Sequence, residues 1–514
     1  MPNGANAQTS LKNLLSTPIT WENWSTQPDI LSFLSDLQAN ILKGHGRDHT
    51  ANIFVSFEDM KPSAIATILN DLSFLTTSAL EQLRAAAAFK SSRVSGGRVL
   101  CTFLAASAYA KLGAAVKAPV DAAFAAGMRG RGQLPKITFD INGNPVPLAG
   151  LNDPDSSTWE RDGAWDPVKP APDAMILIAD DKAELVSSGV ASLKNMLRAA
   201  GARVLGVDVG LAQRRKQTGG DPKGEGVEQF GYVDGRSQPL FLAEDIAANK
   251  ATEKAIADKA HHQWPQWDES FPPAQFIVPD ASGKTAFSCG SFFVYRKLEQ
   301  NVEAFKRRES QLADWMGLDE EDRERAGALV VGRFEDGTPV AVSGSELGGH
   351  PTNNFSYDGK QKNGIELCPF KGHIRKTNPR TSDKTKNADE RRRIMARRGI
   401  TFGDRAPRTI DDDFPEDDLP SAGVGLLFMA YMKDITNQFE FTQAAWAGNN
   451  DFQKPETGID AVIGQRPNRH DKKDINWADG YSGKAADFDF KTAVRLIGGD
   501  YFFAPAISFL QTVS

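Results

Sequence analysis

Apolar and polar positions follow a regular order along the N-terminal part of the chain. Residues 51–57 are rich in β-branched and aromatic side chains and predict a strand. In residues 63–75 the apolar side chains recur at spacings of three and four, which predicts an amphipathic helix. Residues 98–104 predict the next strand. The order then repeats as a strand, an amphipathic helix and a strand, at residues 175–179, 182–200 and 203–209.

The second half of the chain repeats this theme less regularly. Its predicted elements are a strand, a helix, a strand, a helix and a strand, at residues 291–295, 298–315, 425–431, 435–446 and 501–505. Two such halves predict a duplicated ferredoxin-like α+β architecture, with helices on one face of each sheet. We expect an N-terminal arm followed by two halves, with boundaries at residues 1–36, 37–240 and 241–514.

Three long polar inserts interrupt these elements, at residues 152–172, 404–420 and 449–486. Loops of this length inside compact domains are usually functional or mobile. The inserts are expected either to wall an access channel or to decorate the surface.

Composition narrows the class of protein. A chain of 514 residues exceeds what one hydrophobic core usually serves, so two domains or one compound domain are expected. The net charge of -6 gives no reason to expect nucleic acid as a partner. Three cysteines argue against a disulfide framework, and neither a secretory signal nor a membrane span is evident. We expect a cytoplasmic protein with no membrane partner, as a monomer or a homodimer.

A carboxylate between two glycines stands out among the polar segments. Asp234 lies in the sequence GYVDGRSQP at residues 231–239. Glycines here allow the backbone to approach a bulky ligand closely and restrict the freedom of the carboxylate. The same pattern also makes ordinary turns, so it becomes informative only together with a second segment. That segment is GHIRKTNPR at residues 372–380, followed by an arginine-rich run.

The histidines predict haem more readily than zinc. None of the seven histidines belongs to an HExxH pattern, and the chain has no Cys-x-x-Cys. Haem needs only one axial ligand from the protein, because the porphyrin supplies the other four donors. His373 is the candidate by context, since Gly372 leaves room beside it. Cys368, which precedes a proline, is the alternative as a thiolate ligand or a small buried hydrophobe.

A histidine that ligates haem iron becomes a stronger donor when a carboxylate accepts its other ring N–H, because the acceptor raises the basicity of the ring. Glu440 is the candidate, since it interrupts an apolar helical face next to the 425–431 strand. An exposed helix glutamate is the alternative interpretation, with Asp487 and Asp489 as reserves.

Cleaving hydrogen peroxide requires a base that moves a proton and a donor that stabilises charge as the O–O bond breaks. Asp234 suits the first role, and an arginine suits the second because it stays charged and offers several donors. Composition alone does not choose among the five candidates, which are Arg391, Arg392, Arg393, Arg397 and Arg398.

Taken together, the aspartate, histidine and arginine segments resemble the haem site of the dye-decolorizing peroxidases. Further segments are similar to that family: LQANILKGHGRDH at residues 37–49, CPF at 368–370, QFEF at 438–441 and GGDYFFAP at 498–505. The resemblance runs from about residue 37 to the C-terminus. Length and inserts point to the larger subgroup shared by bacteria and fungi.

This resemblance implies two ferredoxin-like halves, of the dimeric α+β barrel type, with one haem b bound between them. It implies that Asp234 is the distal aspartate, His373 the axial ligand and Arg397 the distal arginine, with the neighbouring Arg398 left open. Contacts to the haem edge or propionates are implied for Arg236, Ser237 and Arg375.

The implied activity is a haem peroxidase. Hydrogen peroxide oxidises the haem by two electrons, and dyes, phenols or similar small-molecule reductants then return the electrons singly. Surface Trp or Tyr residues are candidates for relaying electrons from bulky donors. Two rival interpretations stay open: a haem-handling protein that releases iron or senses haem, and a haem-free α+β interaction protein in which the Asp234 glycines make a plain turn.

Overall fold

The computed structural model describes residues 4–114, 116–131, 136–139, 145–148, 150–215, 224–349, 352–362, 364–404, 419–465 and 476–512. Parts of two predicted inserts, residues 405–418 and 466–475, lie outside the described residues, as do His350 and His470.

The N-terminal half is built on four antiparallel strands. In chain order they are β1 (His49–Ser56), β2 (Val99–Leu104), β5 (Ala174–Asp180) and β6 (Arg203–Leu211). In space the order is β2-β5-β1-β6, and helices α3 (Pro62–Ser73) and α7 (Ala183–Ala199) follow β1 and β5. This is the βαββαβ arrangement predicted from the hydrophobic pattern, with helix and strand bounds displaced by one or two residues.

The C-terminal half repeats the arrangement. Its strands are β10 (Cys289–Gln300), β13 (Ala396–Arg397), β14 (Ile400–Phe402), β15 (Gly425–Met432) and β18 (Val494–Ala504). The spatial order β13-β15-β10-β18, with β14 also paired to β15, matches the order of the first half. Helix α9 (Val302–Met316) follows β10, and two π-helical segments, η6 (Thr436–Glu440) and η7 (Thr442–Ala447), follow β15.

In this half one sequence prediction needed correction, and two short strands were not predicted. The helix predicted from residue 298 begins only at Val302, because β10 continues to Gln300 through its pairing with β18. The Asn301 side chain accepts a hydrogen bond from Ala304 N at 2.8 Å and caps the helix there. The short strands β13 and β14 were not predicted, since two or three residues carry too little periodicity.

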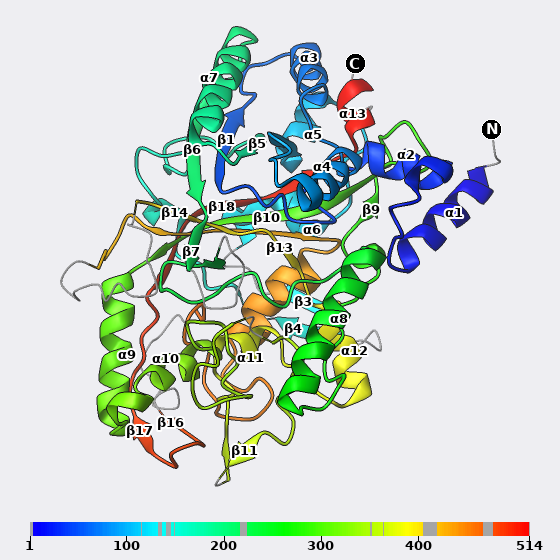
Figure 1. Ribbon diagram of the computed structural model, residues 1–514. Coiled ribbons are helices and arrows are strands. Elements are labelled where there is room, and N and C mark those ends of the chain that lie inside the picture. Colours follow the sequence, from blue (N-terminus) through cyan, green and yellow to red (C-terminus); the bar gives the residue numbers. More distant parts are fainter. Residues whose placement is uncertain are drawn as a thin grey trace.

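The strands of both halves form one continuous sheet that closes on itself. Phe503 on β18 pairs with Leu104 on β2, which joins the halves along one edge. At the other edges the Thr401 hydroxyl on β14 donates to the Leu211 carbonyl on β6. Strands β6 and β14 lie so close that a Cβ on Gly210 would stand 2.5 Å from Ile400. Figure 1 shows these strands running through the middle of the molecule.

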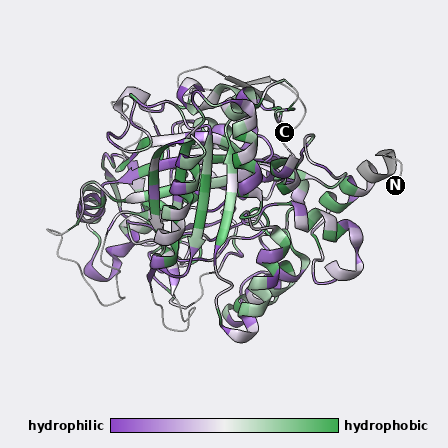
Figure 2. Ribbon diagram, turned by 90° about the horizontal axis from the view of Figure 1, so that it is seen from above, coloured by the Kyte–Doolittle hydropathy of each residue, from purple (hydrophilic) through white to green (hydrophobic). Residues whose placement is uncertain are grey.

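Side chains from both halves fill the interior of the closed sheet. Asp208 on β6 accepts hydrogen bonds from the Trp165 indole at 3.0 Å and the Tyr295 hydroxyl on β10 at 2.7 Å. Lys297 on β10 pairs with the same carboxylate at 2.7 Å. These bonds satisfy a charge that would be costly to bury alone. Figure 2 shows the hydrophobic strands at the centre, with hydrophilic residues concentrated around them.

Apolar residues of α3 and α7 cover the outer face of the N-terminal strands (Figure 1). The other helices are α1 (Gly4–Ser16), α2 (Pro28–Asp36), α4 (Ala79–Ser92), α5 (Ala106–Leu112), α6 (Ala122–Arg131), α8 (Ala243–Ala260), α10 (Glu324–Val331), α11 (His373–Thr377), α12 (Lys384–Arg392) and α13 (Ile507–Thr512). Short strands outside the main path are β3 (Lys136–Phe139), β4 (Pro145–Leu148), β7 (Gln213–Arg215), β8 (Glu225–Val227), β9 (Val278–Pro279), β11 (Gln361–Lys362), β12 (Ile365–Glu366), β16 (Asn476–Ala478) and β17 (Ala485–Asp487). Within the described ranges, every helix is too short or too polar to span a bilayer.

Candidate functional site

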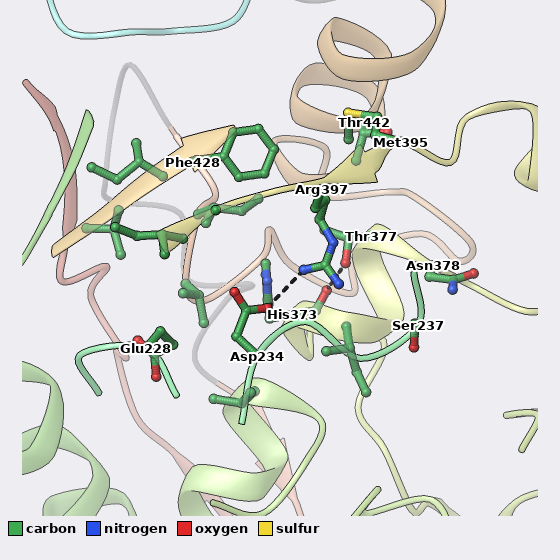
Figure 3. Close-up of a pocket in the computed structure, with 18 of the residues that line it drawn as sticks. Glu228, Asp234, Ser237, His373, Thr377, Asn378, Met395, Arg397, Phe428 and Thr442 are labelled. Carbon is green, nitrogen blue, oxygen red and sulfur yellow. Dashed lines mark hydrogen bonds and ion pairs between the residues drawn. The ribbon is translucent and has the colours of Figure 1, made fainter. Parts of the chain in front are cut away.

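A cavity of about 240 Å³ lies against the C-terminal strands. Strands β10, β15 and β18 supply an apolar wall, to which Leu298, Leu426, Phe428 and Leu496 contribute. The opposite side comes from residues 228–237, the His373 segment and Arg397. Figure 3 shows Phe428 and the polar residues of these segments around one common space.

Asp234 reaches this cavity from a tightly held segment. Gly231 has φ of 101°, a left-handed conformation that glycine adopts without strain, and it turns the chain back after β8. The Asp234 amide then donates to the Gly226 carbonyl at 2.9 Å. The carboxylate is about one-third exposed, and Asp234 is one of the residues that line the cavity.

Arg397 is the arginine that faces Asp234. Its Nη1 donates to Asp234 Oδ1 at 3.1 Å (Figure 3). Its Nη2 donates to the Arg236 carbonyl at 2.7 Å. The next residue, Arg398, points elsewhere and donates to the carbonyls of Asn40 and Ile41, both at 2.8 Å. Successive side chains of an extended segment lie on opposite faces, so only one of the two neighbours reaches the cavity.

His373 is the first residue of α11, and its imidazole has one nitrogen engaged. Nδ1 lies 2.8 Å from Asp460 Oδ2, while the ring is 26% exposed and lines the cavity. In the described part of the chain, Nε2 makes no hydrogen bond, so it is the nitrogen open to a ligand. Gly372 lets the chain pack closely before the histidine, since a Cβ there would lie 3.2 Å from the Leu329 and Pro369 carbonyls.

Backbone amides fix the Asp460 carboxylate in place as the hydrogen-bond acceptor for His373 Nδ1. Its Oδ1 accepts hydrogen bonds from the Val462 and Ile463 amides at 2.8 and 2.9 Å, and the carboxylate is fully buried. Burial opposes a charge on His373, but the adjacent Asp460 outweighs burial and raises the pKa of the imidazole above its usual value. Asp234 and Arg397 are close enough to act on the same pKa, in opposite directions.

The carboxylate predicted to back His373 was wrong. Glu440 is buried as predicted, but its carboxylate receives Arg131 at 2.9 Å and the Tyr501 hydroxyl at 3.0 Å. The reserves lie elsewhere too: Asp487 accepts from Asn476 at 3.2 Å, and Asp489 pairs with Lys491 at 3.9 Å. Asp460 was missed because it lies in a polar insert, 87 residues from the histidine along the chain.

A cluster of cations lines the cavity beyond Ser237. Arg333 and Arg380 both donate to the Asn353 side-chain oxygen, at 3.0 and 2.8 Å. Arg380 also donates to the Ser237 hydroxyl at 2.7 Å. Burial lowers the pKa of Arg380 to about 10, and burial together with Arg380 lowers that of Arg333 to about 9. Neither guanidinium has a carboxylate within salt-bridge distance among the described residues, so this end of the cavity favours an anion.

Arg236 and Ser237, for which haem contacts were predicted, both line this end of the cavity. Arg236 also pairs with Glu225 at 2.7 Å. The prediction for Arg375 needs correction. Its guanidinium binds Glu366 at 3.0 Å and the Cys368 carbonyl, and Arg375 lies outside the cavity lining. Arg333 and Arg380 are the other arginines that line this end of the cavity, beside Ser237. Arg380 was within reach of sequence reasoning, since it ends the quoted GHIRKTNPR segment.

Several buried polar atoms around the cavity have no hydrogen-bond partner in the described ranges. They are Tyr357 Oη, Asn378 Oδ1, Gln300 Oε1 and Thr442 Oγ1. Buried polar atoms are rarely left unpaired, so these atoms indicate that a polar ligand or ordered water completes the site.

Cys368 is the small buried hydrophobe that the sequence allowed as an alternative to a thiolate ligand. It is 1% exposed and packs in the apolar cluster below α9 and α10. Burial raises the pKa of its thiol to about 12, which disfavours the thiolate that haem ligation needs.

Glu228 in the cavity wall gives a stability prediction. Burial raises the pKa of its carboxyl from 4.5 to about 7. The folded state therefore binds the proton more tightly than the unfolded state, and stability falls as pH rises from about 4.5 to about 7. The free energy of unfolding of Glu228→Gln, relative to that of the parent protein, should therefore rise by up to about 3 kcal/mol between pH 5 and pH 8. Denaturant unfolding of both proteins at the two pH values measures this difference, and a constant difference would contradict it.

Comparisons with known proteins show which proteins the whole chain is similar to. The chain is 40% identical over 509 residues to the multifunctional dye peroxidase DyP2 of an Amycolatopsis species, covering 97% of this chain and 99% of the relative. The solved structure of that DyP2 superposes with a TM-score of 0.82, over 97% of this chain and 99% of the other. A DyP-type peroxidase from an Anabaena species has a TM-score of 0.79 at 31% identity, with the same coverage of both chains. No protein-family model matches the chain.

Proposed function

The chain belongs to the dye-decolorizing peroxidase family and is a haem peroxidase, and we propose that Asp234, Arg397 and His373 carry its reaction with hydrogen peroxide. One observation carries this assignment: the Asp234–Arg397 pair and the His373–Asp460 pair open into one cavity. A haem-handling protein would need only the histidine, so the retained distal pair favours the peroxidase.

The residues present fit a haem. Leu298, Leu426 and Phe428 would offer apolar contacts to a macrocycle, and His373 Nε2 is the nitrogen that we propose would bind the iron. Arg333, Arg380 and Ser237, with Arg236 nearby, suit the two carboxylates of a haem b. The anion would meet two guanidinium groups whose shared partner, Asn353, is a neutral amide.

His373 and Asp460 set the electronic character of the site. When bound, the haem supplies the redox centre that accepts oxidising equivalents from peroxide and returns them one electron at a time. Asp460 accepts the Nδ1 proton of His373, which fixes the tautomer with Nε2 as the lone-pair donor. The same hydrogen bond makes the imidazole a stronger donor than a free histidine would be.

Asp234 and Arg397 have different roles in the reaction with hydrogen peroxide. Asp234 Oδ1 is occupied by Arg397, which leaves Oδ2 to take a proton from one peroxide oxygen and return it to the other. Arg397 donates toward the oxygen on which negative charge develops as the O–O bond breaks. The overall change is one hydrogen peroxide, two electrons and two protons to two waters.

The electrons come from a reducing substrate, for which we propose dyes, phenols or similar one-electron donors. Two donor molecules each give up one electron per peroxide. We also propose that the functional halves follow the expected boundaries, with Asp234 in residues 37–240 and His373 and Arg397 in residues 241–514.

An absorption spectrum tests the function. The purified haem-loaded protein is mixed with one equivalent of hydrogen peroxide, and a dye or phenol is then added. A Soret band that changes at once and returns when the donor is added is the expected result. A Soret band that peroxide does not change would indicate a haem carrier instead of a peroxidase. A protein that takes up no haem would overturn the proposal.

Removing the carboxylate behind the axial histidine gives a further prediction. Asp460→Asn should weaken haem binding by about 10- to 100-fold, because the hydrogen-bond partner of a ligating histidine contributes to ligand strength and orientation. The rate of haem transfer to an excess of a haem-accepting protein measures the loss. Glu440→Gln is the control, since its carboxylate serves Arg131 and Tyr501, and it should keep parental haem retention.

A further inference from the structure

The segment that carries Asp234 is itself held by a second carboxylate. We propose that Glu228 is a positioning residue of the peroxide reaction, which fixes the turn at Gly231 and thereby the place of Asp234 opposite Arg397. This inference rests on the role proposed above for Asp234 and adds a residue that acts through it.

Glu228 forms hydrogen bonds to the backbone of its own turn, residues 228–232. Its Oε2 accepts the Phe230 amide at 2.9 Å and its Oε1 accepts the Tyr232 amide at 3.1 Å. The backbone of Glu228 adds two more bonds, since its amide donates to the Tyr232 carbonyl and its carbonyl accepts the Gly231 amide, both at 3.0 Å. Four bonds from one residue thus define the conformation of residues 228–232.

Glu228 also ties this turn to the sheet. The Gln300 side-chain amide on β10 donates to Glu228 Oε2, and the Gln300 backbone amide donates to the Val424 carbonyl at 2.9 Å. Arg397 on β13 is joined to the same sheet through the pairing of Ala430 on β15. Both residues of the distal pair are therefore anchored to the same sheet. Asp234 is anchored through Glu228 and Gln300, and Arg397 through its own strand.

The far side of the turn is held independently. The Val233 amide donates to the Glu335 carbonyl at 3.2 Å, and the Tyr232 hydroxyl donates to Glu309. Glu228 is therefore the contact on the cavity side, next to Asp234, whose charge acts on it. The other charged groups lining the same cavity near the sheet are Arg296 on β10 and Arg397.

The ionised carboxylate, which predominates above a pH of about 7, suits this role. Three N–H donors converge on the two oxygens of Glu228, and a glutamine offers only one accepting oxygen. Glu228→Gln must therefore set its NH₂ group against at least one donor, which loosens the turn without changing the size of the side chain. A displacement of about 1 Å in a reacting group can cost about 10²-fold in rate.

The test compares four haem-loaded variants: Glu228→Gln, Asp234→Asn, the double variant, and Glu390→Gln. Glu390 is the matched control, because burial also raises its pKa to about 7 and it accepts the Thr381 amide at 3.0 Å, but it lies on α12 outside the cavity lining. Stopped-flow absorption gives the rate constant with hydrogen peroxide. Hydrogen–deuterium exchange measured by mass spectrometry gives the protection of residues 228–234.

Glu228→Gln should retain haem, react with peroxide about 10- to 100-fold more slowly, and lose amide protection in residues 228–234. The KM for the reducing donor should not change. Because Glu228 acts through Asp234, the double variant should be little slower than Asp234→Asn alone. Glu390→Gln should match the parent in every measurement.

Unchanged rate and unchanged exchange in Glu228→Gln would overturn the inference, and so would fully multiplicative effects in the double variant. Asp234→Asn reacting at the parental rate would overturn the proposed role of Asp234 instead. Should Glu228→Gln fold poorly, Gln300→Met removes the tie to β10 together with one polar group of the cavity lining, and the loss of amide protection in residues 228–234 is then the deciding readout.

Discussion

His373→Ala is expected to yield a folded protein that retains little or no haem. The imidazole supplies the axial bond that we propose, and the apolar wall and the arginine cluster are left to hold the cofactor without it. The fold should survive because the ring lines the cavity rather than the apolar interior of the sheet. The ratio of Soret to protein absorbance after purification with added haem measures the loss, and far-ultraviolet circular dichroism checks the fold.

Two control variants sharpen this result. Cys368→Ala removes the rival thiol and should keep the full Soret band, since the thiol is buried away from the cavity lining. His45→Ala removes a half-buried imidazole that accepts the Arg47 amide at 3.0 Å, and it should also keep its haem. A full Soret band in His373→Ala would show that another residue ligates the iron. A Soret band lost in Cys368→Ala would revive the thiolate.

The sequence predicted the elements that local periodicity determines. Residues 51–57 and 175–179 became central strands because β-branched and apolar side chains suit a sheet covered on both faces. The helix after residue 182 was recognisable from its single apolar stripe, which packs on β1 and β5. Closure of the sheet was not visible in the pattern, because it depends on contacts between β14 and β6 that lie far apart along the chain.

The site shows the same division between local and long-range information. Asp234 and His373 stand in segments with their own glycine signals, so their candidacy could be argued from neighbours in the sequence. Asp460 carries no such signal, because a carboxylate in a polar insert looks like any solvated loop residue. Only the fold brings it within 2.8 Å of the imidazole. Glu440 was misassigned for the opposite reason: its burial was foreseen, but its partners, Arg131 and Tyr501, come from distant segments.

The second large effect is expected at the distal pair. Asp234→Asn should slow the reaction with hydrogen peroxide by about 10²- to 10⁴-fold, because an amide cannot accept the peroxide proton. Arg397→Leu should slow it by about 10²- to 10³-fold, since it removes a charged donor aimed at the developing negative charge. Both variants should keep their haem, because neither residue takes part in the His373–Asp460 pair. Stopped-flow absorption of the haem-loaded variants, with peroxide in excess, gives both rate constants.

Arg398→Leu provides the matched control for this pair, because the neighbouring guanidinium binds the Asn40 and Ile41 carbonyls away from the cavity. It should lose some stability and react with peroxide at the parental rate. The double variant Asp234→Asn/Arg397→Leu should be slower than either single variant by less than the product of their effects, since the two side chains share a hydrogen bond at 3.1 Å. Parental rates in both single variants would remove Asp234 and Arg397 from the reaction. A slow Arg398→Leu with a normal Arg397→Leu would instead assign the donor role to the neighbouring arginine.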